Sequence, residues 1–187
     1  MKTAVRRILL SSEAINPSPN SLFLPVPQWG SFIGASISTD GVLSEDTTNG
    51  IHVTFRDTPR FTLQTNIPYR WTVWVRPLAR RFVYLTIAPN AGNTRFVTVW
   101  GLDGQELLET KAVGSNPINV STAYRRIRSD VHKLTFNFTI TSGGLTLTPV
   151  IGMSNQFPPT YDVNFDVPFQ GLNQPSIQIL GNELLAI

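Results

Sequence analysis

The sequence predicts an all-β protein that folds as one antiparallel β-sandwich, and three observations support this fold class. Apolar and polar residues alternate with a period of two in many short runs that are rich in aromatic and β-branched side chains. Turn signals separate these runs, such as Asp40-Gly41 and Asn49-Gly50, and Asp103-Gly104 is predicted to close a hairpin. No stretch has the apolar period of a long helix, and 187 residues suffice for one large β domain.

Two alternating runs, at residues 69–76 and 82–87, form the predicted centre of the sandwich. In each run, large apolar residues occupy every second position, as in a strand with one buried face. Pro77 ends the first run, because proline has no N–H to give to a strand ladder. Only a short connection that contains Arg80 and Arg81 separates the runs, so we predict that they pair as antiparallel neighbours.

The rest of the chain follows the same pattern of short strands and turns. Residues 16–27 contain four prolines and are expected to be extended and irregular, and residues 157–169 are expected to form a long loop. Further strands are predicted, in chain order, at residues 32–38, 51–55, 95–100, 106–111, 133–141, 145–150 and 177–180. One of these strands collects four large apolar side chains on one face, those of Leu134, Phe136, Phe138 and Ile140.

The N-terminal segment, residues 1–15, is predicted to be an arm outside the sandwich domain of residues 16–187. It carries Arg6 and Arg7 between apolar residues. We expect this arm to dock onto a partner, with the two arginines facing acidic groups. A partly ordered terminus is the alternative.

Composition excludes several classes of function. The formal net charge is +3, with 12 Arg against 3 Lys and no run of more than three like charges, so a nucleic-acid partner is not expected. There is no cysteine, which excludes disulfides and thiolate chemistry. No run of 18 apolar residues occurs, so no membrane span is expected.

The sequence offers few residues for catalysis. Its two histidines, His52 and His132, lie in separate runs with strand character, and no motif of a nucleophile elbow or a metal-binding histidine pair is present. Many of the acidic residues stand at turns, such as Asp40 and Asp57, where turn chemistry explains them. We therefore expect no enzymatic activity.

One short motif is a weak candidate for a calcium site. Asp162, Asn164 and Asp166 form D-x-N-x-D, which places three oxygen ligands at alternate positions. No glycine stands at the sixth position and no glutamate closes the loop. We favour a strand whose polar residues face outward, and we expect no cofactor.

The second face of the strand at residues 69–76 is a candidate binding surface. Trp71 shares its face with Val73 and Val75 and is expected in the core. The opposite face carries one tryptophan among polar and basic residues, namely Arg70, Thr72, Trp74 and Arg76. An exposed tryptophan beside arginine can anchor a protein interface or stack on a sugar ring.

For this face we favour a protein interface, because acids and amides typical of sugar sites are not near it in the sequence. The alternative is that a loop or the terminal arm covers Trp74 and forms a second core. Self-association, most simply as a trimer, is also expected, because the chain has few charges and ends in the apolar run at residues 184–187.

Five motifs, in this order, resemble those of carbohydrate-binding-module-like jelly-roll domains in bacteriophage structural proteins. They are NPSPNS at 16–21 with Trp29, YRWTVWV at 69–75, VWGLDG at 99–104, YRRI at 124–127 and IQILGNEL at 177–184. The polar segment at 129–133 and the long loop at 155–174 depart from the family pattern.

This resemblance implies a non-enzymatic protein of the virion, assembled in the host cytoplasm, such as a tail, fibre or head-decoration protein. Its implied partners are other virion proteins of the capsid or tail. The alternative is a module that binds a glycan of the host surface.

Overall fold

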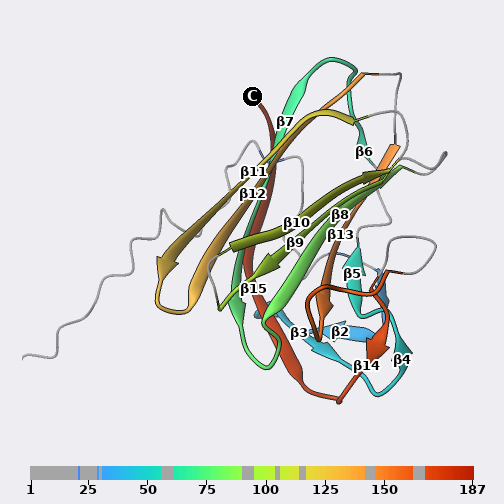
Figure 1. Cartoon of the computed structure of the whole chain (residues 1–187), viewed down its shortest axis with the longest axis vertical. Helices are drawn as coiled ribbons and strands as arrows, with labels where there is room; N and C mark the ends of the chain where they lie inside the picture. The colour runs from blue at the N-terminus through green and yellow to red at the C-terminus, as the bar shows by residue number, and fades with distance from the viewer. Residues whose placement is uncertain are drawn as a thin grey trace, which may run out of the picture.

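The structure of the chain is a computed structural model, which describes residues 21, 29, 31–55, 61–89, 95–103, 106–113, 117–141, 146–161 and 167–187. These residues form fifteen strands and no helix (Figure 1). Among them, therefore, no helical segment has the length and apolar character needed to cross a bilayer. The predicted arm at residues 1–15, with Arg6 and Arg7, lies outside the described residues.

One sheet has six antiparallel strands, with β7 near its middle. Its order is β11 (Pro117–Arg128), β12 (Val131–Ile140), β7 (Pro68–Pro77), β15 (Pro175–Ala186), β3 (Val42–Glu45) and β2 (Ala35–Ile37). The register sets His132 of β12 opposite Val75 of β7, and Leu184 of β15 opposite Trp71. The predicted alternation in β7 and β12 is therefore realised in a continuous ladder, and β7 ends at Pro77 as expected.

The other sheet has seven strands and contains β8. Its order is β1 (Ser31–Ile33), β5 (Val53–Phe55), β13 (Thr146–Ser154), β8 (Phe82–Pro89), β9 (Arg95–Gly101) and β10 (Glu106–Val113), and β6 (Phe61–Thr62) also pairs with β13. The pairing of β9 with β10 confirms the predicted hairpin at Asp103-Gly104. Two short strands, β4 (Asn49–Gly50) and β14 (Phe169–Gln170), pair separately, so Asn49-Gly50 belongs to a strand and not to a simple turn.

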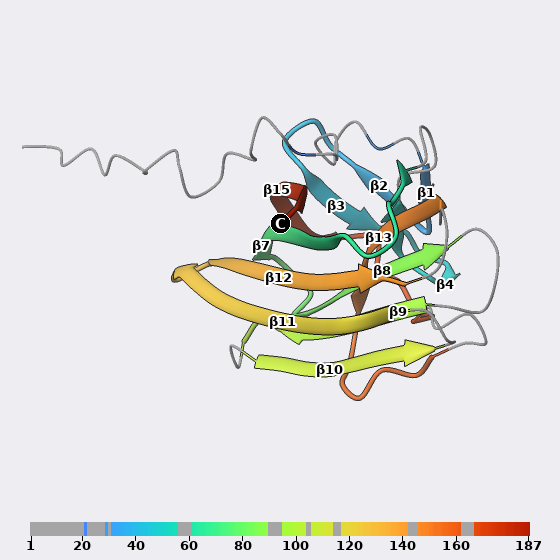
Figure 2. The ribbon, with the colours of Figure 1, turned by 90° about the horizontal axis from the view of Figure 1, so that it is seen from above.

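The two sheets pack face to face around one large apolar core (Figure 2). The six-stranded sheet contributes Trp71, Val73 and Val75, together with the four predicted side chains of β12, and all of these are buried. Val83, Leu85 and Ile87 of β8 enter the same core from the opposite sheet. The antiparallel β-sandwich is thus confirmed, whereas the closer assignment as a jelly roll stays a prediction.

The predicted pairing of β7 with β8 is wrong, because the two strands lie in different sheets. The chain between them is bound to the start of β15, where the amides of Leu78 and Arg80 donate to the carbonyl of Ser176 at 3.1 and 3.0 Å. Beyond it, the amide of Leu102 donates to the carbonyl of Arg81 at 2.8 Å. These hydrogen bonds fix the path of the chain from the six-stranded sheet to the seven-stranded sheet. β7 and β8 therefore bury their apolar faces from opposite sides of the same core.

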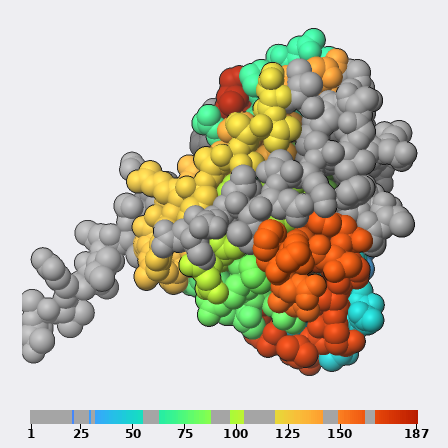
Figure 3. Space-filling view, in the orientation of Figure 1, coloured from blue at the N-terminus to red at the C-terminus, as the bar shows by residue number. Residues whose placement is uncertain are grey.

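A second, smaller core covers the outer face of the seven-stranded sheet. It contains Tyr84 of β8 and Val150 of β13, and it reaches Tyr161 and Val167 in the segment that follows β13. Figure 3 shows this segment, in orange, at the surface in front of the sheet. Gly152 stands opposite Tyr84, and a Cβ at this position would lie 2.1 Å from the tyrosine ring, so only glycine leaves room for Tyr84.

The apolar C-terminal run is not the exposed association surface that the sequence suggested. β15 continues through Ala186, which pairs with Tyr69, and Leu184 is buried in the main core. Leu185 is half-buried, and only the last two residues, Ala186 and Ile187, are exposed. The run is apolar because it belongs to a strand of the sandwich, so it no longer supports the predicted trimer.

Candidate functional site

The outer face of β7 is where the sequence placed the binding residues. The alternation is as predicted, because Trp71 and Val73 face the core while the four candidate residues lie on the other side of the sheet. Arg70 is exposed and Arg76 is half-buried. Thr72 and Trp74, however, are buried.

Trp74 is only 4% exposed, so of the two interpretations that the sequence left open the structure supports the one in which this residue is covered. The register sets Lys133 of β12 beside it, and the lysine ammonium lies 5.3 Å from the centre of the indole ring. A long side chain on a neighbouring strand thus occupies a ring face that a ligand would need. This burial corresponds to the alternative, in which Trp74 is covered.

Arg76 is held by partners within the chain. Its Nε lies 2.7 Å from Asp130 Oδ2 at the tip of the β11–β12 hairpin, and its Nη1 donates to Gln178 Oε1 of β15 at 2.8 Å. The guanidinium therefore ties three strands of the sheet together. It is a structural contact more than a free binding group.

Arg70 belongs to a polar row that crosses three strands. Its Nε donates to Asn137 Oδ1 of β12 at 3.0 Å, and Asn137 Nδ2 donates to Ser121 Oγ of β11 at 3.2 Å. The sequence did not show this row, because Asn137 lies 67 residues from Arg70. The amide that seemed to be missing beside the β7 face is therefore supplied by β12.

The most extensive buried polar cluster lies elsewhere, at the end of the sandwich where β3 meets the β7–β8 connection. Glu45 is 1% exposed, and its carboxylate binds the Arg80 guanidinium through two contacts of 2.6 and 2.8 Å. The same carboxylate accepts bonds from the Leu172 amide at 2.9 Å and from Gln174 Nε2 at 3.1 Å. Arg80 also lies over the ring of Phe169, 4.9 Å from its centre.

Electrostatics explain why this buried pair is charged. Burial by itself raises the pKa of the Glu45 carboxyl, but the hydrogen bonds from Arg80 and Leu172 and the charge of Arg80 together hold it below its ordinary value. The sequence contained one signal for this role. Glu45 stands two residues after Leu43 in a strand and therefore shares its buried face.

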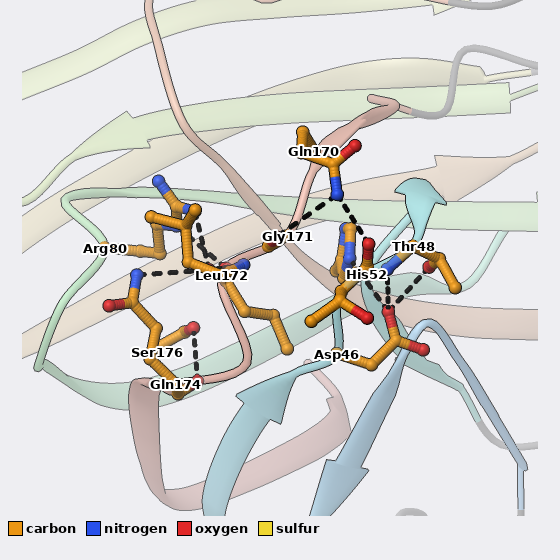
Figure 4. Close-up of polar contacts among 11 residues, drawn as sticks. Asp46, Thr48, His52, Arg80, Gln170, Gly171, Leu172, Gln174 and Ser176 are labelled. Atoms are coloured by element: carbon orange, nitrogen blue, oxygen red, sulfur yellow. Dashed lines mark hydrogen bonds and ion pairs between the residues drawn. The ribbon is translucent and has the colours of Figure 1, made fainter.

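A second polar group adjoins this cluster across Gly171 (Figure 4). His52 is fully buried, its Nε2 lies 3.4 Å from Asp46 Oδ1, and its ring packs 4.3 Å from that of Phe169. The hydroxyl and amide of Thr48 donate to Asp46 Oδ1 and hold the pKa of this carboxyl below its usual range.

Gly171 makes this packing possible. A Cβ on this residue would lie 2.0 Å from the carbonyl oxygen of Asp46 and 2.5 Å from His52 Nε2. An Asp–His pair can polarise an imidazole, but this imidazole is sealed from solvent, and none of the contacts described for it brings a nucleophile beside it. The contacts described for His52 are its approach to Asp46 and its packing against Phe169 of β14.

The other histidine, His132 of β12, is also buried. The Tyr124 hydroxyl is hydrogen-bonded to His132 Nδ1, and the Tyr124 ring stacks on Trp100. Burial and the nearby Arg126 lower the pKa of His132, against the opposing effect of Asp130 and Asp103. Burial disfavours the charged form of Tyr124 as well, and this raises the pKa of its hydroxyl.

We expect stability to fall as the pH drops below about 6.5, the ordinary pKa of histidine. In this range the unfolded chain binds a proton at residue 132 and the folded chain does not, so protonation favours unfolding until the lowered folded pKa is reached. Urea unfolding at a series of pH values measures the effect. The change His132→Gln should flatten the curve in this window. An unaltered curve for His132→Gln would contradict the prediction.

Metal binding gains no support from the described residues. None of them forms a group of three His, Cys, Asp or Glu side chains that could hold a metal ion. The calcium candidate, Asp162 with Asn164 and Asp166, falls outside the described residues. The prediction that these three residues face outward from a strand and bind no metal therefore stays untested.

No protein-family model matches the chain, and no curated protein matches it significantly. The functional argument consequently rests on the residues and on the geometry described above.

Proposed function

We propose that the chain is a non-enzymatic structural or accessory protein of a bacteriophage particle, either a head decoration or a component of a head or tail fibre. It would display a jelly-roll sandwich bound to capsid or tail proteins, and the predicted homotrimer now rests on the low fraction of charged residues, 14%. The motif order at residues 16–184 and the antiparallel sandwich both support this proposal.

The structural role of the buried ion pair between Glu45 and Arg80 supports the proposal that the chain is not an enzyme. Glu45 joins Arg80 to the chain at Leu172 and Gln174, so its charge fastens three segments at one end of the sandwich. A group in this position is neutralised and fully hydrogen-bonded, which suits a rigid display module.

Analysis of purified particles tests the proposal. Particles from the source culture would be banded on a density gradient and probed with antibodies raised against the recombinant chain. We expect the chain to band with the particles in a copy number that is a multiple of three. A chain that stays in the soluble fraction, without particle-bound copies, would refute the virion assignment.

A host-surface glycan-binding module is the second candidate. The row formed by Arg70, Asn137 and Ser121 favours it, because guanidinium, amide and hydroxyl groups are donors and acceptors suited to sugar hydroxyls and carboxylates. Both functions are compatible with one protein, since a displayed domain can also bind the host.

A further inference from the structure

Positive charge is concentrated in one part of the sandwich. The strands β7, β11, β12 and β15, with the turn between β11 and β12, carry six Arg or Lys residues and only two acidic residues, Asp130 and Glu183. This excess exceeds the formal net charge of +3 for the whole chain. A surface with such an excess attracts anionic partners.

Two of these basic residues are engaged at the tip of the β11–β12 hairpin. Arg76 binds Asp130, and Arg126 donates to the carbonyls of Arg128 and Ser129 at 3.1 and 2.6 Å. These contacts fix the tip of the β11–β12 hairpin. Of the other four, Arg128 ends β11 opposite Val131, while Arg70, Arg125 and Lys133 lie on the outer face of the sheet, where Arg70 Nε donates to Asn137 and Lys133 lies over Trp74.

These three residues lie in two rows across the strands. Arg125 stands opposite Lys133, which stands opposite Trp74, and this forms the first row. The second row, formed by Ser121, Asn137 and Arg70, is four residues further along the strands, about 13 Å away. Arg70, Ser121 and Arg125 are exposed, and parts of β11 and β12 appear in yellow at the surface in Figure 3.

The outer face lacks the features that other anionic partners require. Single-stranded nucleic acid stacks on exposed aromatic rings, whereas Trp74 is buried under Lys133. A protein interface is centred on exposed apolar or aromatic anchors. The large hydrophobic residues that are exposed in the described chain, Ile33, Leu78, Phe157, Leu172 and Ile187, all lie outside β7, β11 and β12.

We propose that the outer face of β7, β11 and β12, termed here the basic face, binds a polysaccharide that carries carboxylate groups. Arg70, Arg125 and Lys133 would pair with the carboxylates, and Asn137 and Ser121 would bond to sugar hydroxyls between them. A planar guanidinium can hold a carboxylate through two parallel hydrogen bonds, which gives geometric selectivity as well as attraction. The inference rests on the glycan-binding candidate above and is independent of the location on a particle.

Calorimetric titration of the full chain at 0.15 M salt tests the proposal. The probes are polygalacturonate, neutral dextran, dextran sulfate and polyglutamate, matched in chain length. We expect polygalacturonate to bind at least tenfold more tightly than dextran and polyglutamate. The changes Arg70→Gln and Arg125→Gln should each weaken this binding several-fold without a change in melting temperature.

The matched control is Arg81→Gln, which removes one exposed positive charge that is paired with exposed Asp103 in a different part of the fold. It should leave binding unchanged, and an equal loss in this control would show non-specific attraction and overturn the proposal. Equal binding of dextran would keep glycan recognition but overturn the acidic class. Equal or tighter binding of polyglutamate or of dextran sulfate would overturn carboxylated polysaccharide as the ligand. No binding by any polysaccharide would remove the glycan-binding candidate itself.

Discussion

Replacement of Arg80 by methionine is expected to lower the free energy of unfolding by about 3–5 kcal/mol. The change removes the partner of a carboxylate whose side chain is fully buried, while the Arg80 side chain itself is only 12% exposed. The Glu45 carboxylate would remain in the interior with the weaker donors of Leu172 and Gln174, which cannot neutralise its charge. Urea unfolding at pH 7 gives the difference directly.

The adjacent residue supplies the control for this experiment. Arg81 binds Asp103 at 2.9 Å, but both side chains are more than half exposed. An exposed ion pair is screened by water and salt, so Arg81→Met should cost less than about 1 kcal/mol. Similar losses for the two variants would mean that the buried pair contributes no more than a surface contact.

The pH dependence of the same pair provides an independent check. The pKa of Glu45 is lowered in the folded chain, so its contribution is complete above the unfolded value near 4.5 and is lost as the pH falls through the folded pKa. Stability of the wild type should therefore decline over this acidic window. In Arg80→Met this part of the decline should shrink, because the main cause of the lowered pKa has been removed.

Truncation of Trp74 to alanine is the second change with a large expected effect, a loss of about 3–5 kcal/mol in the free energy of unfolding. The indole is 4% exposed in a strand that is paired on both sides, so removal of the ring leaves a cavity or exposes apolar surface. Thermal and urea unfolding of the variant beside wild type measure the loss. The matched change Lys133→Gln removes the cation above the ring and should cost only about 1 kcal/mol.

This experiment also separates the two interpretations of the β7 face that the sequence left open. If Trp74 lay at an interface, its truncation would weaken particle association and leave the melting temperature unchanged. If Trp74 is buried, its truncation lowers the melting temperature whether or not the chain is bound to a particle. An unchanged stability for Trp74→Ala would therefore restore the interface interpretation and argue against the burial described here.

The candidate sites show why sequence alone was a weak guide to function. The two faces of β7 were assigned correctly from the alternation of its residues. The alternation did not show, however, that Thr72 and Trp74 on the outer face are buried. Arg70 meets Asn137 across 67 residues of chain, and Arg80 meets Glu45 across 35. Partners this far apart in the sequence come together only through strand pairing and packing, which a local pattern does not encode.

The sequence by itself determined several elements of this protein: the strands β7, β8, β9, β10 and β12, the buried faces of β7, β8 and β12, the hairpin between β9 and β10, and the end of β7 at Pro77. These features are local, because side-chain alternation and proline chemistry act within a few residues. The tertiary structure alone decided that β7 and β8 lie in opposite sheets and that Lys133 covers Trp74. Both outcomes depend on which distant strands pair, and the alternating pattern of a strand is the same for every neighbour that it might have.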